Sequence, residues 1–174
     1  MTPRLQIQLN FGSIAGLAGF GTFLLYHFLG FNPLGNISWL TFWLPYVIVY
    51  FGTKKYREEE LEGYISFGQA YGYSLFTIMI FATLYGMLSY LFGMFIDGTI
   101  LDKYIAEAME GIAKMEQLES LIGEETIELA AKEIQQTTMA SISLSDVANK
   151  MIGGLLIAVI IALAIRKDKP VFDE

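Results

Sequence analysis

The chain has no cysteine, a single histidine and two long stretches without charge. Without cysteine it forms no disulfide, no thiolate nucleophile and no cysteine-ligated metal site. No Asp, Glu, Lys or Arg occurs from Leu5 to Thr53 or from Gly63 to Ile96. Because roughly 20 helical residues cross the hydrocarbon layer of a bilayer, such stretches predict membrane spans. We therefore expect one integral membrane domain, residues 1–174, in contact with the lipid bilayer.

Sequence motifs of catalysis and cofactor binding are missing as well. The chain contains no nucleophile elbow, no His-Glu-x-x-His motif, no Gly-rich phosphate loop with lysine and no carboxylate pair inside a predicted span. Its acidic segments lack the alternating Asp/Asn/Gly pattern of a calcium loop. The net charge of −7 argues against nucleic acid as a partner. We expect no enzyme activity, no cofactor and no metal site.

The apolar segments predict an all-α fold, an integral membrane four-helix bundle. The predicted spans are residues 10–29, 37–52, 67–96 and 147–165. A turn, GFNPLGN, separates the first two spans, and Pro45 predicts a kink in the second. The third span is about 45 Å long at 1.5 Å per residue, so it must tilt or project beyond the bilayer.

The distribution of Lys and Arg predicts the orientation of the spans. Seven bases share one side of a four-span chain: Arg4, Lys54, Lys55, Arg57, Arg166, Lys167 and Lys169. The other side has four lysines dispersed among 11 acids, if Lys150 is counted with residues 97–146. Because cytoplasmic loops carry the excess of Lys and Arg, both termini and the loop at residues 53–66 are predicted to be cytoplasmic.

The acidic segment at residues 97–146 predicts an extracytoplasmic helical hairpin between spans 3 and 4. Ile105, Met109 and Ile112 recur at helical spacing, and Gly123 is a plausible end for the first helix. Residues 124–136 begin with two acids, as a helix N-terminus prefers. Ser143 or Ser145 is the expected N-cap of the last span.

The block KKYREEELEG, residues 54–63, has a topological explanation. Lys54, Lys55 and Arg57 suit the carbonyl end of the second span, and the glutamates that follow suit the amide end of the third. Ser66 and Gln69 have the Ser-x-x-Gln form of a capping box, which places the N-cap of the third span at Ser66. Partner docking and weak cation binding are the alternatives for this block.

The segment YFGTKKYREEELEGYISFGQAY, residues 50–71, resembles the signature of a family of small bacterial membrane proteins catalogued as domain of unknown function 4199. The matching positions are Gly52, Lys54 or Lys55, Tyr56, Arg57, Glu58, Glu59, Gly63, Tyr64, Ile65, Ser66, Phe67, Gly68 and Ala70. Leu61, Glu62 and Gln69 depart from the pattern. The resemblance covers the whole layout of spans and implies this architecture in the bacterial cytoplasmic (inner) membrane. It transfers no functional residue.

Small residues recur at the spacing that lets membrane helices approach closely. They are Gly12 with Gly16, Gly68 with Gly72, and Gly154 with Ala158 and Ala162. One interpretation is packing within a four-helix bundle, and the other is a homo-oligomer formed through the Gly154 stripe. His27, near the turn at Gly30, is either a hydrogen-bonded interfacial residue or a functional group.

Two function classes remain after these exclusions. The first is a non-enzymatic interaction, scaffold or accessory protein with a membrane-protein partner. The second is a small transporter or channel subunit, although ion pathways usually contain buried ionisable groups and only Lys150 lies inside a predicted span. The sequence identifies neither a transported solute nor a partner.

Overall fold

The computed structural model describes residues 2–116 and 124–169, and these residues are almost entirely helical. The all-α prediction is therefore confirmed. The elements are α1 (Pro3–Phe28), the 3-10 helix η1 (Asn36–Leu40), α2 (Leu44–Glu60), α3 (Phe67–Phe95), α4 (Thr99–Glu116), α6 (Glu124–Gln135) and α7 (Met139–Ile165). Gly123, the expected end of the first outer helix, lies outside the described residues.

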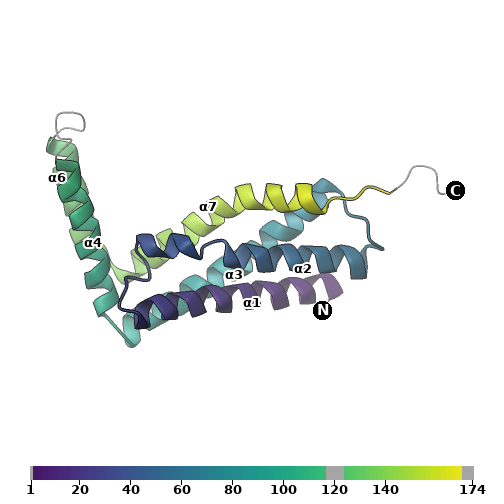
Figure 1. The fold of residues 1–174 in the computed structure, drawn as a ribbon, viewed down its shortest axis with the longest axis horizontal. Coiled ribbons are helices and arrows are strands. Elements are labelled where there is room, and N and C mark those ends of the chain that lie inside the picture. The colour runs from purple at the N-terminus through teal and green to yellow at the C-terminus, as the bar shows by residue number, and fades with distance from the viewer. Residues whose placement is uncertain (1, 117–123, 170–174) are drawn as a thin grey trace.

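Four of the helices run side by side, and the other two lie across one end of them (Figure 1). Helix α3 contacts both α1 and α7, and α1 also contacts α2. Helices α4 and α6 contact each other and project from the end where α3 finishes (Figure 1). We call α4 and α6 the arm, this end the arm end, and the opposite end, where α2 turns into α3, the loop end.

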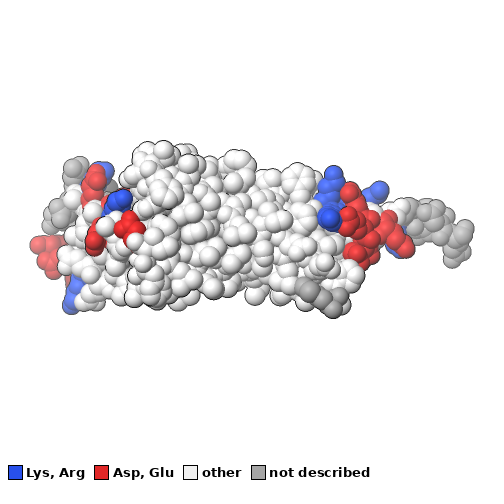
Figure 2. All heavy atoms as spheres, turned by 90° about the horizontal axis from the view of Figure 1, so that it is seen from below, with Lys and Arg blue, Asp and Glu red and all other residues white. Residues whose placement is uncertain are grey.

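Three helices among the described residues are long and apolar enough to cross a membrane, namely α1, α3 and α7. They include the first, third and fourth predicted spans. Helix α2 is not in this set because it is only 17 residues long, and its last seven residues, Lys54 to Glu60, belong to the charged block. Figure 2 shows the charged side chains gathered at the two ends of the molecule, with an uncharged band between them.

The second predicted span differs from the helix that forms. We expected a helix at residues 37–52 with a kink at Pro45, but η1 ends at Leu40 and α2 begins at Leu44 with Pro45 in its first turn. Proline suits that position because its missing N–H would have no intrahelical partner there. Helix α2 then continues to Glu60, through most of the loop expected at residues 53–66.

The helix ends test the capping predictions. Ser66 caps α3 as expected, with its Oγ accepting from the Gln69 N–H at 3.3 Å and the Gln69 side chain accepting from the Ser66 N–H at 3.1 Å. The expected cap of the last helix is wrong. Thr138, two turns before the apolar run, forms a capping box with Ser141 instead.

The turn after α1 depends on Gly30, which has a φ of +84°. The Gly30 N–H donates to the His27 carbonyl and the Phe31 N–H donates to the Tyr26 carbonyl, both at 3.0 Å. This is a Schellman motif, which needs a left-handed residue just after the helix. It turns the chain back toward η1 at the arm end.

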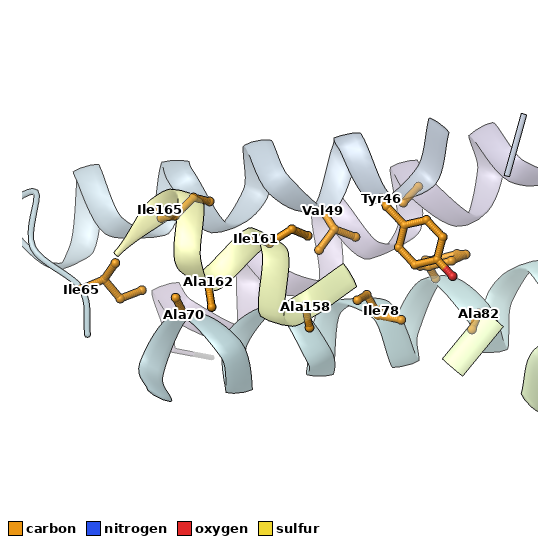
Figure 3. Packing of buried hydrophobic residues seen from close by; sticks show 12 residues of the cluster. Tyr46, Val49, Ile65, Ala70, Ile78, Ala82, Ala158, Ile161, Ala162 and Ile165 are labelled. Carbon is orange, nitrogen blue, oxygen red and sulfur yellow. The ribbon is translucent and has the colours of Figure 1, made fainter. Parts of the chain in front are cut away.

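The core lies between α2, α3 and α7 in the loop half of the molecule. Figure 3 shows Val49, Ile78, Ala158, Ile161 and Ala162 packed together, and each is at most 4% exposed. A second, smaller cluster lies toward the arm and contains Phe23, Tyr85, Phe92, Ile100 and Met139. The two clusters hold the helices on either side of the cavity described next.

Candidate functional site

A cavity of about 610 Å³ lies at the arm end, between η1, α2, α4 and α7. Its wall is largely aromatic, and the rings come from five helices and the turn between η1 and α2: Phe23, Tyr26, Trp39, Phe42, Tyr46, Tyr85 and Tyr104. Trp39 and Leu156 form part of the lining and are 68% and 71% exposed, so the cavity opens sideways past η1 and α7. Volumes of 300–1,000 Å³ are typical of small-molecule sites.

An ion pair on α7 lines this cavity. Lys150 Nζ lies 2.5 Å from Asp146 Oδ1, and both side chains are about three-quarters buried. The same ammonium lies 4.1 Å from the centre of the Tyr85 ring, in the position of a cation–π contact. The second carboxylate oxygen of Asp146 is buried and has no hydrogen-bond partner among the described residues. This oxygen lies outside the ion pair, and the Tyr85 hydroxyl is a neighbouring donor.

Helix α2 is fixed to this part of α7 by a tyrosine. The Tyr46 hydroxyl donates to the carbonyl oxygen of Lys150 at 2.8 Å, and the Tyr46 ring packs edge-on against Phe81 at 5.2 Å. Tyr46 is 5% exposed. This contact sets the distance between α2 and α7 on the cavity floor.

The arm closes the cavity through a second carboxylate. Glu107 of α4 accepts from Asn32 Nδ2 at 2.7 Å and from the Asn36 N–H at 3.0 Å. A β-carbon on Gly35 would collide with the same carboxylate. Glu107 thus ties the arm to the turn before η1, and both of its oxygens are occupied.

A third polar contact joins the arm to α1. His27 Nε2 lies 3.5 Å from Asp97 Oδ2, while Asp97 Oδ1 accepts from the Thr99 N–H at 2.9 Å and so caps α4. Hydrogen bonds from Thr99, with a smaller contribution from His27, lower the pKa of Asp97 below its ordinary value of 3.8. His27 therefore lies within ion-pair distance of Asp97 where α1 meets the arm, and its Nδ1 is buried without a hydrogen-bond partner among the described residues. Both interpretations of His27 from the sequence stay predictions.

The predicted topology residues lie at the loop end, and one of them has a specific contact. Arg57 Nη1 donates to the Ile165 carbonyl at 2.9 Å, at the C-terminus of α7. Sequence reasoning assigned Arg57 to the end of its own helix and missed this contact. Beside it, Ile65 and Lys167 form an antiparallel β-bridge. Lys54, Lys55 and Arg166 do not enter this contact.

The glutamates of the charged block do not lie at the N-terminus of α3, where the sequence predicted them. Glu58, Glu59 and Glu60 form the last turn of α2, and the first turn of α3 contains no acid. A shallow hollow of about 460 Å³ lies between this turn and residues 167–169. Its charged groups are exposed, and Lys169 reaches Glu62 across it at 3.3 Å.

The small residues fall into two groups. Gly12, Gly16 and Gly154 lie where an added β-carbon would come within 3.0 Å of Ile80, Leu84 and Ile78, respectively. Ala158 and Ala162 are fully buried against the same helix, α3. The Gly154 stripe is thus covered within the chain. No described atom lies within 4 Å of a β-carbon at Gly68 or Gly72, which leaves these two on an open face.

Sequence reasoning missed the cavity, because its residues come from five helices and the turn before η1. One signal was present in the sequence: Asp146 and Lys150 have the i,i+4 spacing of a helical ion pair. Helix α7 begins eight residues before the predicted span, so the pair lies within the helix and not in a connecting loop. The described residues contain no group of three or more His, Asp or Glu placed to hold a metal ion.

The fold and the site together define an all-helical protein with three helices fit to cross a membrane and a side-opening aromatic cavity at one end. The family described as Protein of unknown function (DUF4199) matches residues 10–167, and the chain belongs to this family. No curated protein and no solved structure matches the chain.

Proposed function

We propose that the protein is a multi-pass bacterial inner-membrane protein in which α1, η1 with α2, α3 and α7 form a four-helix bundle across the bilayer. The uncharged band in Figure 2 supports this arrangement. Residues 36–53 contain no charge, and η1 with the uncharged part of α2 adds up to about 25 Å before the connecting turn is counted. The arm is then an extracytoplasmic helical hairpin, and both termini are cytoplasmic.

The cavity lies at the outer boundary of the hydrocarbon layer in this arrangement, with its inner part, beside Lys150, within the layer. Lys150 precedes Ile165, the last residue of α7, by 15 residues, or about 22 Å along the helix. Because the hydrocarbon layer is about 30 Å thick, Lys150 lies inside it and Asp146 lies near its outer boundary. Ionisable residues at this depth are rare and mark functional sites by default.

The function that this geometry supports best is non-enzymatic binding, as an interaction or accessory protein that holds an amphipathic molecule in the cavity. The single observation that carries this proposal is the side-opening aromatic cavity with a buried ion pair. Lys150 is tied to Asp146, and Glu107 to Asn32 and Asn36, so these groups hold geometry and are poorly placed to transfer protons.

A small transporter or channel subunit is the second candidate, and the buried ion pair is the observation in its favour. Against it, Val49, Ile78 and Ala158 fill the bundle directly below the cavity and are fully buried. A transport pathway would have to open this packed core. Binding without passage requires no such rearrangement.

The orientation is testable by cysteine labelling, because the natural chain has no cysteine to remove. Single cysteines at Thr2 and Glu60 should be protected from a membrane-impermeant maleimide in intact cells, and a cysteine at Glu125 should react. A cysteine at Asn36 should react as well if η1 and α2 complete the fourth span. Labelling of Glu60 from outside would refute the four-span arrangement.

Binding is testable by filling the cavity. A β-carbon at Gly153 meets only the Tyr46 hydroxyl, at 3.8 Å, so Gly153→Leu places its side chain in the cavity. Gly21→Leu is the matched control, since no described atom lies near its β-carbon and it lies outside the cavity. Ligand at 100 times its dissociation constant contributes about 2.7 kcal/mol, which corresponds to a rise in Tm of about 5–10 °C.

A total membrane lipid extract should therefore raise the Tm of the delipidated wild type and of Gly21→Leu, but not that of Gly153→Leu. Equal shifts in all three proteins would refute binding in the cavity. Flux of ions or solutes through the protein in reconstituted vesicles would refute the binding-only function and favour the transporter.

A further inference from the structure

We propose that the cavity binds the headgroup of a membrane lipid that carries an ammonium group. This inference rests on the proposed function, which requires only that some amphipathic molecule binds there. It adds the source of the ligand, the lipid bilayer, and the chemical class of its headgroup.

The position of the opening identifies the bilayer as the source. Three exposed residues of the lining, Trp39, Phe42 and Leu156, form an apolar part of the rim, and the exposed Asn36 and Asn149 form a polar part. The three apolar residues lie on η1, in the turn between η1 and α2, and on the apolar part of α7. A molecule that enters here comes from the lipid phase and leaves its acyl chains against Leu156 and Trp39. The arm covers the opposite, end-facing side through Tyr104 and Glu107.

The charges of the lining favour a cation. Two carboxylates, Asp146 and Glu107, face one ammonium, that of Lys150, so the formal charge of the lining is negative. The Lys150 ammonium is already held by Asp146 and by the Tyr85 ring. An anionic headgroup would meet the excess carboxylate with no free base to neutralise it. An ammonium meets a surface of the opposite sign.

The aromatic wall of the cavity also favours a cation. Tyr26, Tyr46, Tyr85 and Tyr104 come from four helices and surround the space beside the ion pair. Rings that converge in this way recognise primary and quaternary ammonium groups through their negative faces. Lys150 already occupies the face of Tyr85, which shows that an ammonium fits against a ring of this cavity. The oxygen of Asp146 that Lys150 does not hold supplies the acceptor for a second one.

Tryptophan fluorescence can test the inference, because the chain has only two tryptophans, Trp39 at the rim and Trp43. Trp43→Phe leaves Trp39 as the only reporter. In this background, delipidated protein in detergent is titrated with phosphatidylethanolamine or phosphatidylglycerol that carry identical brominated acyl chains. Bromine quenches Trp39 when a chain lies beside it. The double variant Trp43→Phe, Gly153→Leu serves as the control, because any quenching that it still shows comes from lipids that touch the rim without entering the cavity.

We expect phosphatidylethanolamine to reach half-maximal quenching at a concentration at least tenfold lower than phosphatidylglycerol. Asp146→Asn should reduce this preference at least fivefold by removing the carboxylate without changing its shape. Asp102→Asn is the matched control, since Asp102 is an exposed acid on α4 outside the cavity. It should keep the preference of the parent protein.

Each other outcome overturns the inference in a distinguishable way. Equal quenching by both lipids, or a preference for phosphatidylglycerol, would refute recognition of an ammonium headgroup but not the binding of a lipid in the cavity. Quenching that Gly153→Leu does not reduce shows contact at the rim only, and the proposed binding function fails with it. If Asp146→Asn does not fold, the comparison of the two headgroups on the parent protein still decides the question.

Discussion

Replacing Arg57 by methionine should destabilise the protein far more than the same replacement of Lys55. Both bases belong to the charged block and carry the same charge. Only Arg57 reaches another helix, where its Nη1 donates to the Ile165 carbonyl at 2.9 Å while Nη2 pairs with Glu58 at 2.9 Å. Its side chain is 18% exposed, so solvent screens the contact with Ile165 little, whereas the pair with Glu58 is weaker because Glu58 is 50% exposed.

The magnitude follows from these contacts. A hydrogen bond to a charged group contributes about 1.5–3 kcal/mol, and a cation at a partly buried helix C-terminus contributes up to about 2 kcal/mol. These contributions overlap, so we expect Arg57→Met to lower the free energy of unfolding by about 2–4 kcal/mol. Lys55 forms an exposed i,i+4 pair with Glu59 at 3.6 Å, which is worth about 0.3–0.5 kcal/mol.

Unfolding in mixed micelles with increasing sodium dodecyl sulfate, followed by circular dichroism, measures both variants against the wild type. Arg57→Lys keeps the charge but loses the planar fork, and it should lie between the wild type and Arg57→Met. Cysteine labelling at Thr2 checks that all variants keep the same orientation. If Arg57→Met and Lys55→Met lower the free energy of unfolding equally, the block acts through its charge alone. The contact with Ile165 would then contribute nothing to stability.

Two further predictions concern the packing of the helices and the hinge of the arm. Gly12→Ala places a β-carbon 2.7 Å from Ile80 and should lower the free energy of unfolding by about 1–3 kcal/mol in the same assay. Gly72→Ala meets open space and should instead raise it by about 0.5–1 kcal/mol, because alanine favours the helix. A stabilising effect of Gly12→Ala would contradict the close approach of α1 and α3. The pKa of Asp97 is lowered in the folded protein, so the Asp97 carboxylate contributes to stability above the ordinary pKa of 3.8. This contribution is lost as the pH falls through the lower, folded-state pKa, because protonation removes the acceptor for Thr99. Asp97→Asn should remove this acid-dependent step from a pH titration of thermal stability, and an unchanged titration would show that another group causes it.

The parts of the fold that could be predicted are those that depend on neighbouring residues. Ser66 and Gln69 form a capping box because both partners lie within four positions of each other. The uncharged runs gave α1, α3 and α7, since length and hydropathy are properties of one segment. Pro45 was misjudged because proline fits the first turn of a helix as well as a kink, and only the preceding backbone decides between them.

The charged block shows what charge does and does not predict. Lys, Arg and Glu keep a segment out of the hydrocarbon layer, but they are also good helix formers. Helix α2 therefore continues through residues 54–60, although we expected a loop. The change from uncharged to charged residues at Lys54 was interpreted as the end of the helix, although the helical backbone continues there.

The cavity could not be predicted, because no short stretch of sequence contains it. The Tyr46 hydroxyl and the Lys150 carbonyl are 104 positions apart, and Glu107 meets Asn32 across 75 positions. Such contacts follow from the packing of α2, α4 and α7. The pair Asp146 and Lys150 is the exception, since both residues lie on one helix and their spacing is visible in the sequence.

The contact between Arg57 and Ile165 also affects the order of events during synthesis. The two residues are 108 positions apart, and chains grow at roughly 5–20 residues per second. For about 5–20 s, therefore, Arg57 has left the ribosome while the helix that it caps has not. During this interval the end of α2 must rely on water, lipid headgroups or the glutamates beside it. The contacts of the charged block are thus completed last, when α7 arrives and closes the loop end.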